Sequence, residues 1–510
     1  MDAIYEDLTK IPTTRSNQQL QSAIVIIDNS TGDIVALSGG VGEKTVHDGW
    51  NIATDARLQT GSAQKPISVY APAFESGAVT PATVLKDLPI SYTNGRFPKN
   101  DSGRYDYAKT VFQGITSSHN TISCRTLGLT GFEYAYNFAK NSFGLEGLTD
   151  HYEASNGKIM NDLDYSPLAL GALTLGVTVR DMSEAYATFA NNGVWREGRT
   201  YTKVYDSEGN LVLDNVQTER QILSEKTVNY MNYCLYNAAN YGTGGAAVFS
   251  GTAIAGKTGT TSSNRDRWFC GYSAYYTAAV WCGYNHPEEI RLTGNTQNPS
   301  ARLWKMVMEP IHKGLAWKGL YNGNKFITVN VCLDSGKLAS AACAKDPRGT
   351  RTVAVSVYSG DAPGGYCDKH VSMEYCVTGG GVATEYCKKF QGVEITEKAL
   401  VKLNKTEIDE IKRAAAVGLY ENHTVDGYVF FTDGAWKGFN DGHPNNESSY
   451  LTCTVHTKAA YDKQEEEKRL EEEKKKQEEE EKKKQEEEQK RKEEEEKKKQ
   501  EEAAKATIPT

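Results

Sequence analysis

The chain reads GSAQKPISVYA at residues 61–71, a stretch that places Ser62 three residues before Lys65. A serine hydroxyl acylates poorly at neutral pH unless a neighbouring group takes its proton. In a helix the i, i+3 spacing puts the lysine amine over the hydroxyl, and Pro66 requires the helix to begin very near Ser62. Ser62 is therefore predicted at the positive end of a helix dipole, although S-x-x-K alone also fits an ordinary solvated helix start.

Two further motifs follow in the chain. Ser118-His119-Asn120 lies in a polar stretch between two helical-looking segments, where a turn with a helix N-cap is the plain alternative. Lys257 lies in AGKTGTT at residues 255–261, and aromatic and β-branched runs follow it, so we predict an edge strand of an antiparallel sheet. A strand lysine with flanking hydroxyls suits a substrate carboxylate, and Gly259 lacks the side chain that would keep a peptide from the strand backbone.

The same lysine also fits a phosphate-binding loop. Residues 251–258 read GTAIAGKT, which matches G-x-x-x-x-G-K-[ST], and the hydrophobic run 23–27 ends in Asp28. That loop requires a helix directly after the lysine, so that backbone amides point at phosphate. Residues 259–264, GTTSSN, open a helix poorly, and a strand-like run follows. A P-loop nucleotide-binding protein is therefore the distant alternative.

With these motifs in order, the chain resembles the transpeptidase domain of class A (bifunctional) penicillin-binding proteins over roughly residues 20 to 318. Outside the motifs, the resemblance rests on residues 23–40, 57–62, 166–171, 185–193 and 266–269. It implies an α+β fold, in which an antiparallel five-stranded sheet is flanked by helices and accompanied by an all-helical subdomain.

The resemblance also implies roles for single residues. Ser62 is the acylated nucleophile, Lys65 the expected base, Ser118 a proton relay to the departing amine, and Asn120 a contact to the substrate amide. Lys257, Thr258 and Thr260 hold the terminal carboxylate of a donor peptide or a β-lactam, and the backbone N–H groups of Ser62 and Thr260 form the oxyanion hole.

The implied reaction crosslinks peptidoglycan stem peptides through a serine acyl-enzyme. Penicillin acylates the same serine and so inhibits the enzyme. If water takes the acyl group instead, the enzyme is a D,D-carboxypeptidase. A serine β-lactamase shares the motifs but needs a glutamate that activates a deacylating water; Glu133 is the one faint candidate, and we interpret it as a surface helix residue. No metal or cofactor is implied, and the expected partners are stem peptides and β-lactams.

Charge and hydropathy bear on location. The net charge of −8 and the pI near 5.8 lack the basic footprint of a nucleic-acid-binding protein. No stretch approaches the apolar length of a membrane span, and the N-terminus MDAIYED lacks the pattern of a signal peptide. We therefore expect a fragment of a longer, membrane-anchored protein that acts outside the cytoplasm; a natural short form is the alternative.

Three regions are expected: a transpeptidase domain at residues 1–325, a small Cys-rich module at 326–462, and a charged tail at 463–510. Five of the ten cysteines lie between Cys332 and Cys387, which favours disulfides, most simply Cys332 with Cys343 or Cys367 with Cys376. The alternative is a zinc site in which the C-x-x-H pairs at 367–370 and 453–456 come together. The tail has 19 Glu against 15 Lys plus Arg from residue 463 to 502, a pattern that fits a solvated helix or disorder.

Overall fold

The computed structural model describes Ile4 and residues 16–43, 48–93, 95, 97–292, 297–346, 350–402, 406–407, 410, 413, 429–432, 435–438 and 452–505. The chain forms two compact units. The first contains residues 1–343, 350–368 and 409–423, and the second contains residues 344–349, 369–408 and 424–510. The N-terminal residues 1–3 and 5–7, considered above for a signal peptide, lie outside the described part.

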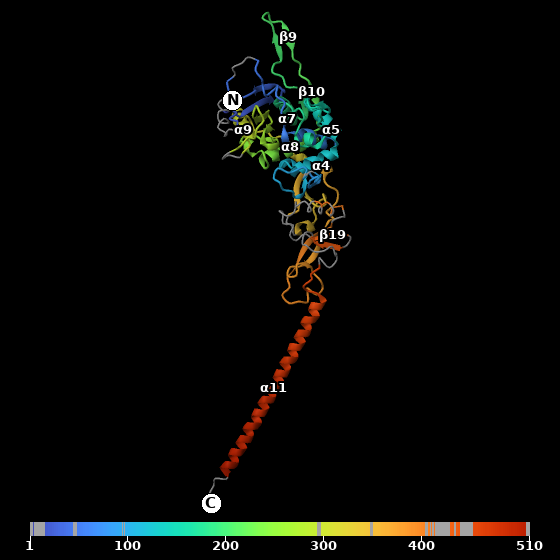
Figure 1. Cartoon of the computed structure of the whole chain (residues 1–510), viewed down its shortest axis with the longest axis vertical. Coiled ribbons are helices and arrows are strands. Elements are labelled where there is room, and N and C mark those ends of the chain that lie inside the picture. Colours follow the sequence, from blue (N-terminus) through green and yellow to red (C-terminus); the bar gives the residue numbers. More distant parts are fainter. Residues whose placement is uncertain are drawn as a thin grey trace. The chain divides into compact units, whose positions relative to one another are not determined.

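A five-stranded antiparallel sheet organises the first unit (Figure 1), and this confirms the fold class predicted from the sequence. Its strands, in spatial order, are β11 (Ala255–Thr260), β12 (Arg267–Tyr272), β13 (Tyr276–Gly283), β1 (Gln21–Asp28) and β2 (Ile34–Ser38). The lysine motif thus lies on an edge strand, as expected.

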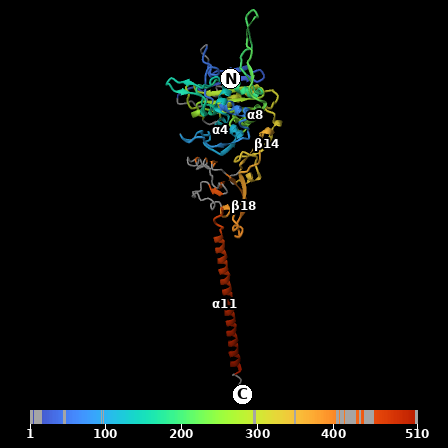
Figure 2. The ribbon, with the colours of Figure 1, turned by 90° about the vertical axis from the view of Figure 1, so that its right-hand side faces the viewer.

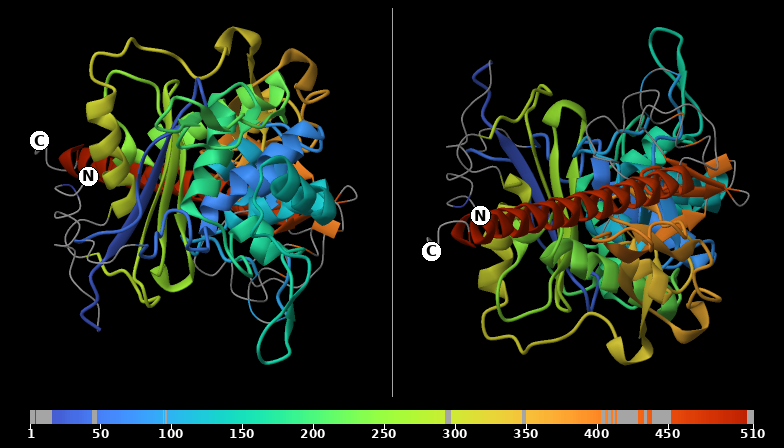
Figure 3. Two further views of the ribbon diagram at one scale, coloured as in Figure 1. Left: turned by 90° about the horizontal axis from the view of Figure 1, so that it is seen from above. Right: turned by 90° about the horizontal axis from the view of Figure 1, so that it is seen from below.

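Helices cover both faces of this sheet. In β1, Ala23, Val25 and Ile27 belong to the core that includes α7 (Val179–Ala190), because alternate strand residues point to opposite faces. Ile24 and Ile26 belong to a second core that includes Trp304 of α9 (Pro299–Ile311). Burial on both faces explains why residues 23–27 of β1 are all hydrophobic. Figure 3 shows the strands between α9 and the other helices.

The polypeptide between β2 and β11 contains more helix than strand, but it is not all-helical as the resemblance implied, because short strands also occur in it. Its longer elements are α3 (Val111–Thr116), α4 (Asn120–Thr130), α5 (Phe132–Asn137), α6 (Tyr165–Leu170), α7 and α8 (Glu225–Asn240). Short strands complete it: β3 (Val84–Asp87), β4 (Tyr107–Thr110), β5 (Tyr152–Glu153), β6 (Ile159–Met160), β7 (Val194–Arg196), β8 (Lys203–Tyr205), β9 (Leu211–Asp214) and β10 (Glu219–Gln221).

The segment that carries Ser62 is helical, but it is not the single α-helix predicted. A 3₁₀ turn, η1 (Gly61–Gln64), leads into a π-helical turn, η2 (Pro66–Tyr70), and then into α2 (Ala71–Glu75). Pro66 lies at the first position of the π-helical turn, where its missing N–H group is tolerated. The helical start near Ser62 was therefore predicted correctly, whereas its regular pitch was not, and π-helical turns are frequent at functional sites.

Among its described residues, the C-terminal part contains a two-stranded antiparallel sheet and a five-stranded sheet in which one pairing, β18 with β19, is parallel. In the first unit, β14 (Ile327–Cys332) pairs with β15 (Thr352–Val357). In the second unit, β16 (His370–Cys376) pairs with β17 (Gly381–Val382) and β18 (Ile395–Lys402), and β19 (Val429–Thr432) and β20 (Ala435–Gly438) extend this sheet. Figure 2 labels β14 and β18.

In the structure the charged tail forms one helix, α11 (Lys458–Lys505), which is one of the two alternatives considered above (Figures 1 and 2). Its described side chains from Glu465 to Ala503 are exposed, so no face of this stretch is buried. Within the described part of the chain, no helix combines the length and the hydrophobicity that crossing a bilayer requires.

Candidate active site

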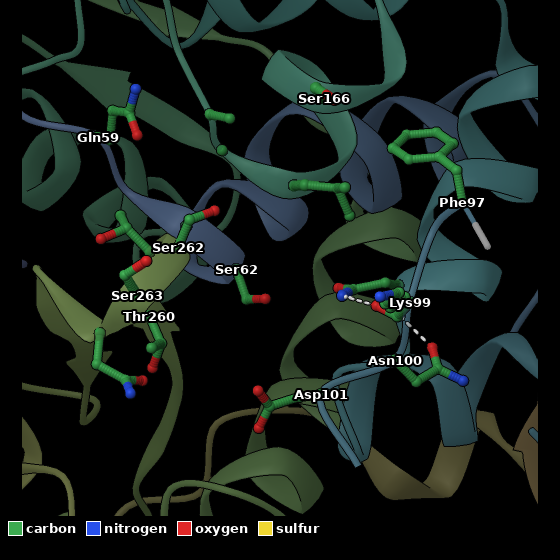
Figure 4. A pocket seen from close by; sticks show the side chains of 17 residues that line it. Gln59, Ser62, Phe97, Lys99, Asn100, Asp101, Ser166, Thr260, Ser262 and Ser263 are labelled. Carbon is green, nitrogen blue, oxygen red and sulfur yellow. Dashed lines mark hydrogen bonds between the residues drawn. The ribbon is translucent and has the colours of Figure 1, made fainter. Parts of the chain in front are cut away.

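The Ser62 side chain borders a pocket of about 490 Å³, whose wall also includes residues 59 and 61, strand β11 and the α6 region. The other lining residues are Gln59, Gly61, Phe97, Lys99, Asn100, Asp101, Asn120, Ser166, Leu170, Gly171, Ala172, Thr260, Thr261, Ser262, Ser263 and Asn264. Figure 4 shows the Ser62 hydroxyl pointing into this space, with Thr260 and Asp101 at its edge. Two of the three predicted motifs, those of Ser62 and Asn120, therefore contribute directly to the pocket wall.

Lys65 lies fully buried behind the serine. Its Nζ donates hydrogen bonds to Asn120 Oδ1 at 2.6 Å and to the Ser118 carbonyl oxygen at 2.9 Å, and it lies 3.5 Å from Ser118 Oγ. Among the described residues no hydrogen bond joins Lys65 to Ser62, although such bonds often tighten only when substrate arrives. Burial lowers the pKa of Lys65 to about 7, while Cys124 and Asp101 act in the opposite direction.

Lys257, in strand β11, also contacts Ser118. Its Nζ donates to Ser118 Oγ at 2.7 Å and to the Thr258 carbonyl oxygen at 3.1 Å. Burial, together with the positive charge of Lys65, holds the pKa of Lys257 well below its ordinary value. Two buried amines therefore meet at one hydroxyl, which provides a path for a proton between them.

Ser118 adopts an unusual backbone conformation, with φ of 59°. It lies in the short link between α3 and α4, where His119 N–H donates to the Gly114 carbonyl oxygen at 2.9 Å. The left-handed region is uncommon for residues other than glycine, and such strain concentrates at functional sites. It is this turn that brings the Ser118 hydroxyl between the two lysines.

A buried aspartate supports this turn, and sequence reasoning missed it. Asp87, at the end of β3, accepts hydrogen bonds from Thr121 Oγ1, from Asn100 Nδ2 at 2.8 Å and from Asp106 N–H at 2.7 Å. His119 Nδ1 lies 3.4 Å from Asp87 Oδ2. Burial would raise the pKa of Asp87, but His119 and the hydrogen-bond donors outweigh it and lower the pKa. No sequence motif marks Asp87, because its partners come from distant parts of the chain.

The carboxylate-binding residues predicted on β11 lie in different surroundings. Thr260 lines the pocket and accepts a hydrogen bond from Arg267 Nη1 at 3.0 Å, whereas the Thr258 hydroxyl lies 2.7 Å from that of Thr243. A side chain on Gly259 would meet the Thr60 carbonyl oxygen at 2.3 Å. The glycine thus lets strand β11 pack against the Ser62 segment, which differs from the peptide access we expected it to provide.

The structure argues against both rival interpretations. Lys257 and Thr258 lie within strand β11, so no helix follows the lysine as a phosphate-binding loop requires. Glu133 is exposed in the first turn of α5, as predicted, and no glutamate is among the residues that line the Ser62 pocket. The carboxylate in that wall belongs to Asp101, another residue that no sequence motif marked.

Comparison with known proteins agrees with this geometry. Residues 22–309 match the family "Penicillin binding protein transpeptidase domain", and residues 324–372 match "Penicillin-binding protein 1A, C-terminal domain". Penicillin-binding protein 1A of Clostridium botulinum is 30% identical over 381 residues, which cover 72% of this chain and 44% of that protein. Penicillin-binding protein 1F of Bacillus subtilis is 30% identical over 299 residues, which cover 58% of this chain and 39% of that protein.

Solved structures show the same fold. Penicillin-binding protein 1A from Haemophilus influenzae aligns with a TM-score of 0.53 and 23% identity over 68% of this chain and 54% of that one. The PonA1 protein from Mycobacterium tuberculosis, solved in complex with penicillin V, aligns with a TM-score of 0.50 and 23% identity over 62% of this chain and 84% of that one. The chain spans less than half the length of the curated relatives above. Because the family match covers more than half of the chain, the protein belongs to the penicillin-binding protein transpeptidase domain family.

Proposed function

We propose that the chain is a serine D,D-transpeptidase that crosslinks peptidoglycan stem peptides and binds β-lactams covalently. One observation carries the proposal: the pocket serine, Ser62, is backed by a buried lysine with a pKa near 7, and that lysine and a second one converge on Ser118. A buried neutral amine can accept the proton that a serine nucleophile must lose.

Each residue has a role in this proposal. Ser62 attacks the penultimate D-alanine carbonyl, and the proton passes from its hydroxyl to Lys65. Ser118 returns a proton to the departing amine; its hydroxyl lies 2.7 Å from Lys257 Nζ, which can resupply it. Lys257 and Thr260 receive the terminal carboxylate, and Asn120, whose Nδ2 donates to the Lys99 carbonyl oxygen at 2.6 Å, borders the donor peptide.

The proposal assigns this chemistry to residues 1–325, with residues 326–462 as an appended module and residues 463–510, which contain most of α11, as a spacer. Because stem peptides lie outside the cytoplasmic membrane, we place the enzyme there, associated with the membrane. A D,D-carboxypeptidase uses the same residues and differs only in the acceptor, which is water. The absence of glutamate from the lining of the described Ser62 pocket favours slow deacylation over β-lactamase turnover.

Fluorescent penicillin tests the proposal. We expect stable labelling of the full chain, with the adduct mapped to Ser62 by peptide mass spectrometry, and no labelling of Ser62→Ala. A label that is released within seconds, with recovery of free enzyme, would instead indicate a β-lactamase. ATP hydrolysis that is unaffected by Ser62→Ala would revive the nucleotide-binding alternative.

A further inference from the structure

The C-terminal region contains an internal repeat of cysteines. Residues 332–343 read CLDSGKLASAAC, and residues 376–387 read CVTGGGVATEYC, with both cysteines, a central glycine and an alanine at matching positions. Each segment is followed by a C-x-x-H sequence, CDKH at 367–370 and CTVH at 453–456. The same arrangement of three cysteines and one histidine therefore occurs twice.

The backbone of the two segments repeats as well. In each, the glycine four residues after the first cysteine has a positive φ, 72° at Gly336 and 70° at Gly380. Each glycine N–H donates to the carbonyl oxygen of that cysteine, at 2.8 Å to Cys332 and 2.9 Å to Cys376. The third cysteine makes the same backbone hydrogen bond in each copy, to the residue six positions after the first cysteine. Cys367 N–H donates to the Leu338 carbonyl oxygen at 2.7 Å, and Cys453 N–H donates to the Val382 carbonyl oxygen at 2.9 Å. The segments are two copies of one structural motif.

The three cysteines of each copy lie together, and the structure records all ten cysteines as free thiols. Cys367 belongs with Cys332 and Cys343, whereas Cys376 belongs with Cys387 and Cys453. The two cysteines of the predicted Cys367–Cys376 disulfide thus belong to different clusters, and so do the two C-x-x-H pairs of the alternative zinc site. The predicted Cys332–Cys343 pair lies within one cluster and stays a prediction. The Sγ atoms of Cys367 and Cys332 are 3.5 Å apart, far beyond the roughly 2.05 Å of a disulfide.

The second copy brings four metal-binding groups together within one unit. The Sγ atoms of Cys376, Cys387 and Cys453 and a ring nitrogen of His456 all lie within 4.8 Å of one another, and all four residues are buried. His456 Nδ1 is 3.3 Å from Cys376 Sγ and 3.2 Å from Cys453 Sγ. A tetrahedral zinc ion, with Zn–S of about 2.3 Å and Zn–N of about 2.0 Å, holds its donor atoms roughly 3.5 to 3.8 Å apart. The cluster therefore already has nearly the dimensions of a zinc site.

The surroundings of the three sulfurs suit thiolates. Each sulfur accepts a backbone N–H at 3.3 Å, from Gly379 to Cys376, from Thr384 to Cys387, and from His456 to Cys453. Zinc binds the deprotonated thiol, and hydrogen bonds to the sulfur favour that form. Three thiols cannot all pair as disulfides within the cluster, whereas three thiolates and one imidazole complete a tetrahedral site.

We infer that Cys376, Cys387, Cys453 and His456 bind one zinc ion. Four protein ligands leave no open position for water or substrate, so the ion is structural. It joins the end of strand β16, through Cys376, to the segment directly before α11, through Cys453 and His456. The charged helix is thereby anchored to the sheet of its own unit by a metal site.

Metal analysis of the full chain tests this inference. The purified protein should contain zinc by inductively coupled plasma mass spectrometry, and Cys376→Ser, Cys387→Ser and His456→Ala should each lower the zinc content by one equivalent per chain. Cys234→Ala, at a buried cysteine of helix α8 outside both clusters, should leave the zinc content unchanged. His456→Cys should retain the ion, because zinc also accepts four cysteines.

The His456→Cys variant separates metal binding from general unfolding. Retention of zinc by His456→Cys with its loss in His456→Ala supports a ligand role, since both variants remove the same imidazole. Unchanged zinc content in all the cluster variants, or unreduced protein that lacks zinc and contains a disulfide within the cluster, would overturn the inference.

Discussion

Lys257 Nζ donates a hydrogen bond to Ser118 Oγ over 2.7 Å, and Lys65 Nζ lies 3.5 Å from the same oxygen. The two amines come from different parts of the fold, one from an edge strand and the other from the nucleophile segment. When Lys65 is protonated, its charge repels that of Lys257 at this range, and this repulsion adds to burial in lowering the pKa of Lys257. This placement supports the proposed role of Ser118 as a proton relay between the two amines.

Replacement of these residues should separate proton transfer from substrate binding. We expect Ser118→Ala to slow acylation by fluorescent penicillin by about 10²- to 10⁴-fold at saturation, which is the usual contribution of general acid–base catalysis. Lys257→Ala should mainly raise the penicillin concentration needed for half-maximal rate, because it removes a cation from the carboxylate site. Lys313→Ala, at an exposed lysine after α9, is the control and should match the unsubstituted protein. An unchanged rate in Ser118→Ala would contradict a relay role.

Acylation should depend on pH through Lys65, whose pKa is lowered to about 7. Since only the neutral amine can accept the serine proton, the second-order rate constant should be constant above about pH 7.5 and fall tenfold per pH unit below about 6.5. Lys65→Arg, which stays charged, should abolish acylation across this range. Stopped-flow labelling from pH 5 to 9 measures the profile, and a flat profile would exclude Lys65 as the base.

The same shift affects stability. The folded chain binds fewer protons at Lys65 than the unfolded chain between about pH 7 and the ordinary value of 10.5. The contribution of Lys65 to the free energy of unfolding therefore increases as pH rises through this window.

The sequence predicted the sheet, the edge position of Lys257 and the turn at Ser118, because each depends on local pattern and motif order. It did not predict the role of Asp87, because the hydrogen-bond donors to its carboxylate, at positions 100, 106 and 121, come together only in the folded chain. The grouping of three cysteines in each cluster was not predicted, for a related reason. Cys376 and Cys453 are separated by 76 residues, so spacing alone favoured pairs of nearby cysteines. A sequence pattern predicts the placement of residues that are close together in the sequence, whereas these sites depend on contacts between remote segments.

Asp87→Asn should destabilise the turn that carries Ser118. The substitution keeps the shape of the side chain but removes the negative charge that accepts hydrogen bonds from Thr121, Asn100 and the Asp106 N–H. We expect a loss of about 1 to 3 kcal/mol in the free energy of unfolding by urea, and slower acylation at penicillin concentrations that saturate the enzyme. Asp150→Asn, at an exposed aspartate, should change neither quantity. Full acylation in a destabilised Asp87→Asn protein would limit Asp87 to a structural role.

Helix α11 should behave as a salt-sensitive spacer. Four of its ion pairs join a glutamate to the lysine four residues later, Glu471–Lys475, Glu479–Lys483, Glu488–Lys492 and Glu495–Lys499. Salt screens these exposed pairs. The helical circular dichroism signal of the tail, measured as the difference between the full chain and residues 1–462, should therefore decrease between 10 mM and 1 M salt.

Removal of residues 463–510 should leave penicillin labelling and the thermal midpoint unchanged. A midpoint lowered by several degrees would show that the helix packs on the body.

Gly259→Ala should damage the site without touching a reacting atom. The new methyl group would lie 2.3 Å from the Thr60 carbonyl oxygen and 3.0 Å from Ala63 Cβ, so strand β11 must move away from the Ser62 segment. Backbone atoms cannot yield as a flexible side chain does, and overpacking of this kind costs about 1 to 3 kcal/mol. We expect lower stability and slower acylation together, because Thr260 and Lys257 move with the strand.

Gly245→Ala provides the matched control, since a methyl group there meets no atom within 4 Å. It should keep both the thermal midpoint and the acylation rate of the unsubstituted chain. The alternative role of Gly259, which is to admit the peptide to the strand, predicts a different result for Gly259→Ala: normal stability with weaker binding of penicillin. Thermal unfolding and the concentration dependence of labelling, measured on both variants, decide between the two explanations.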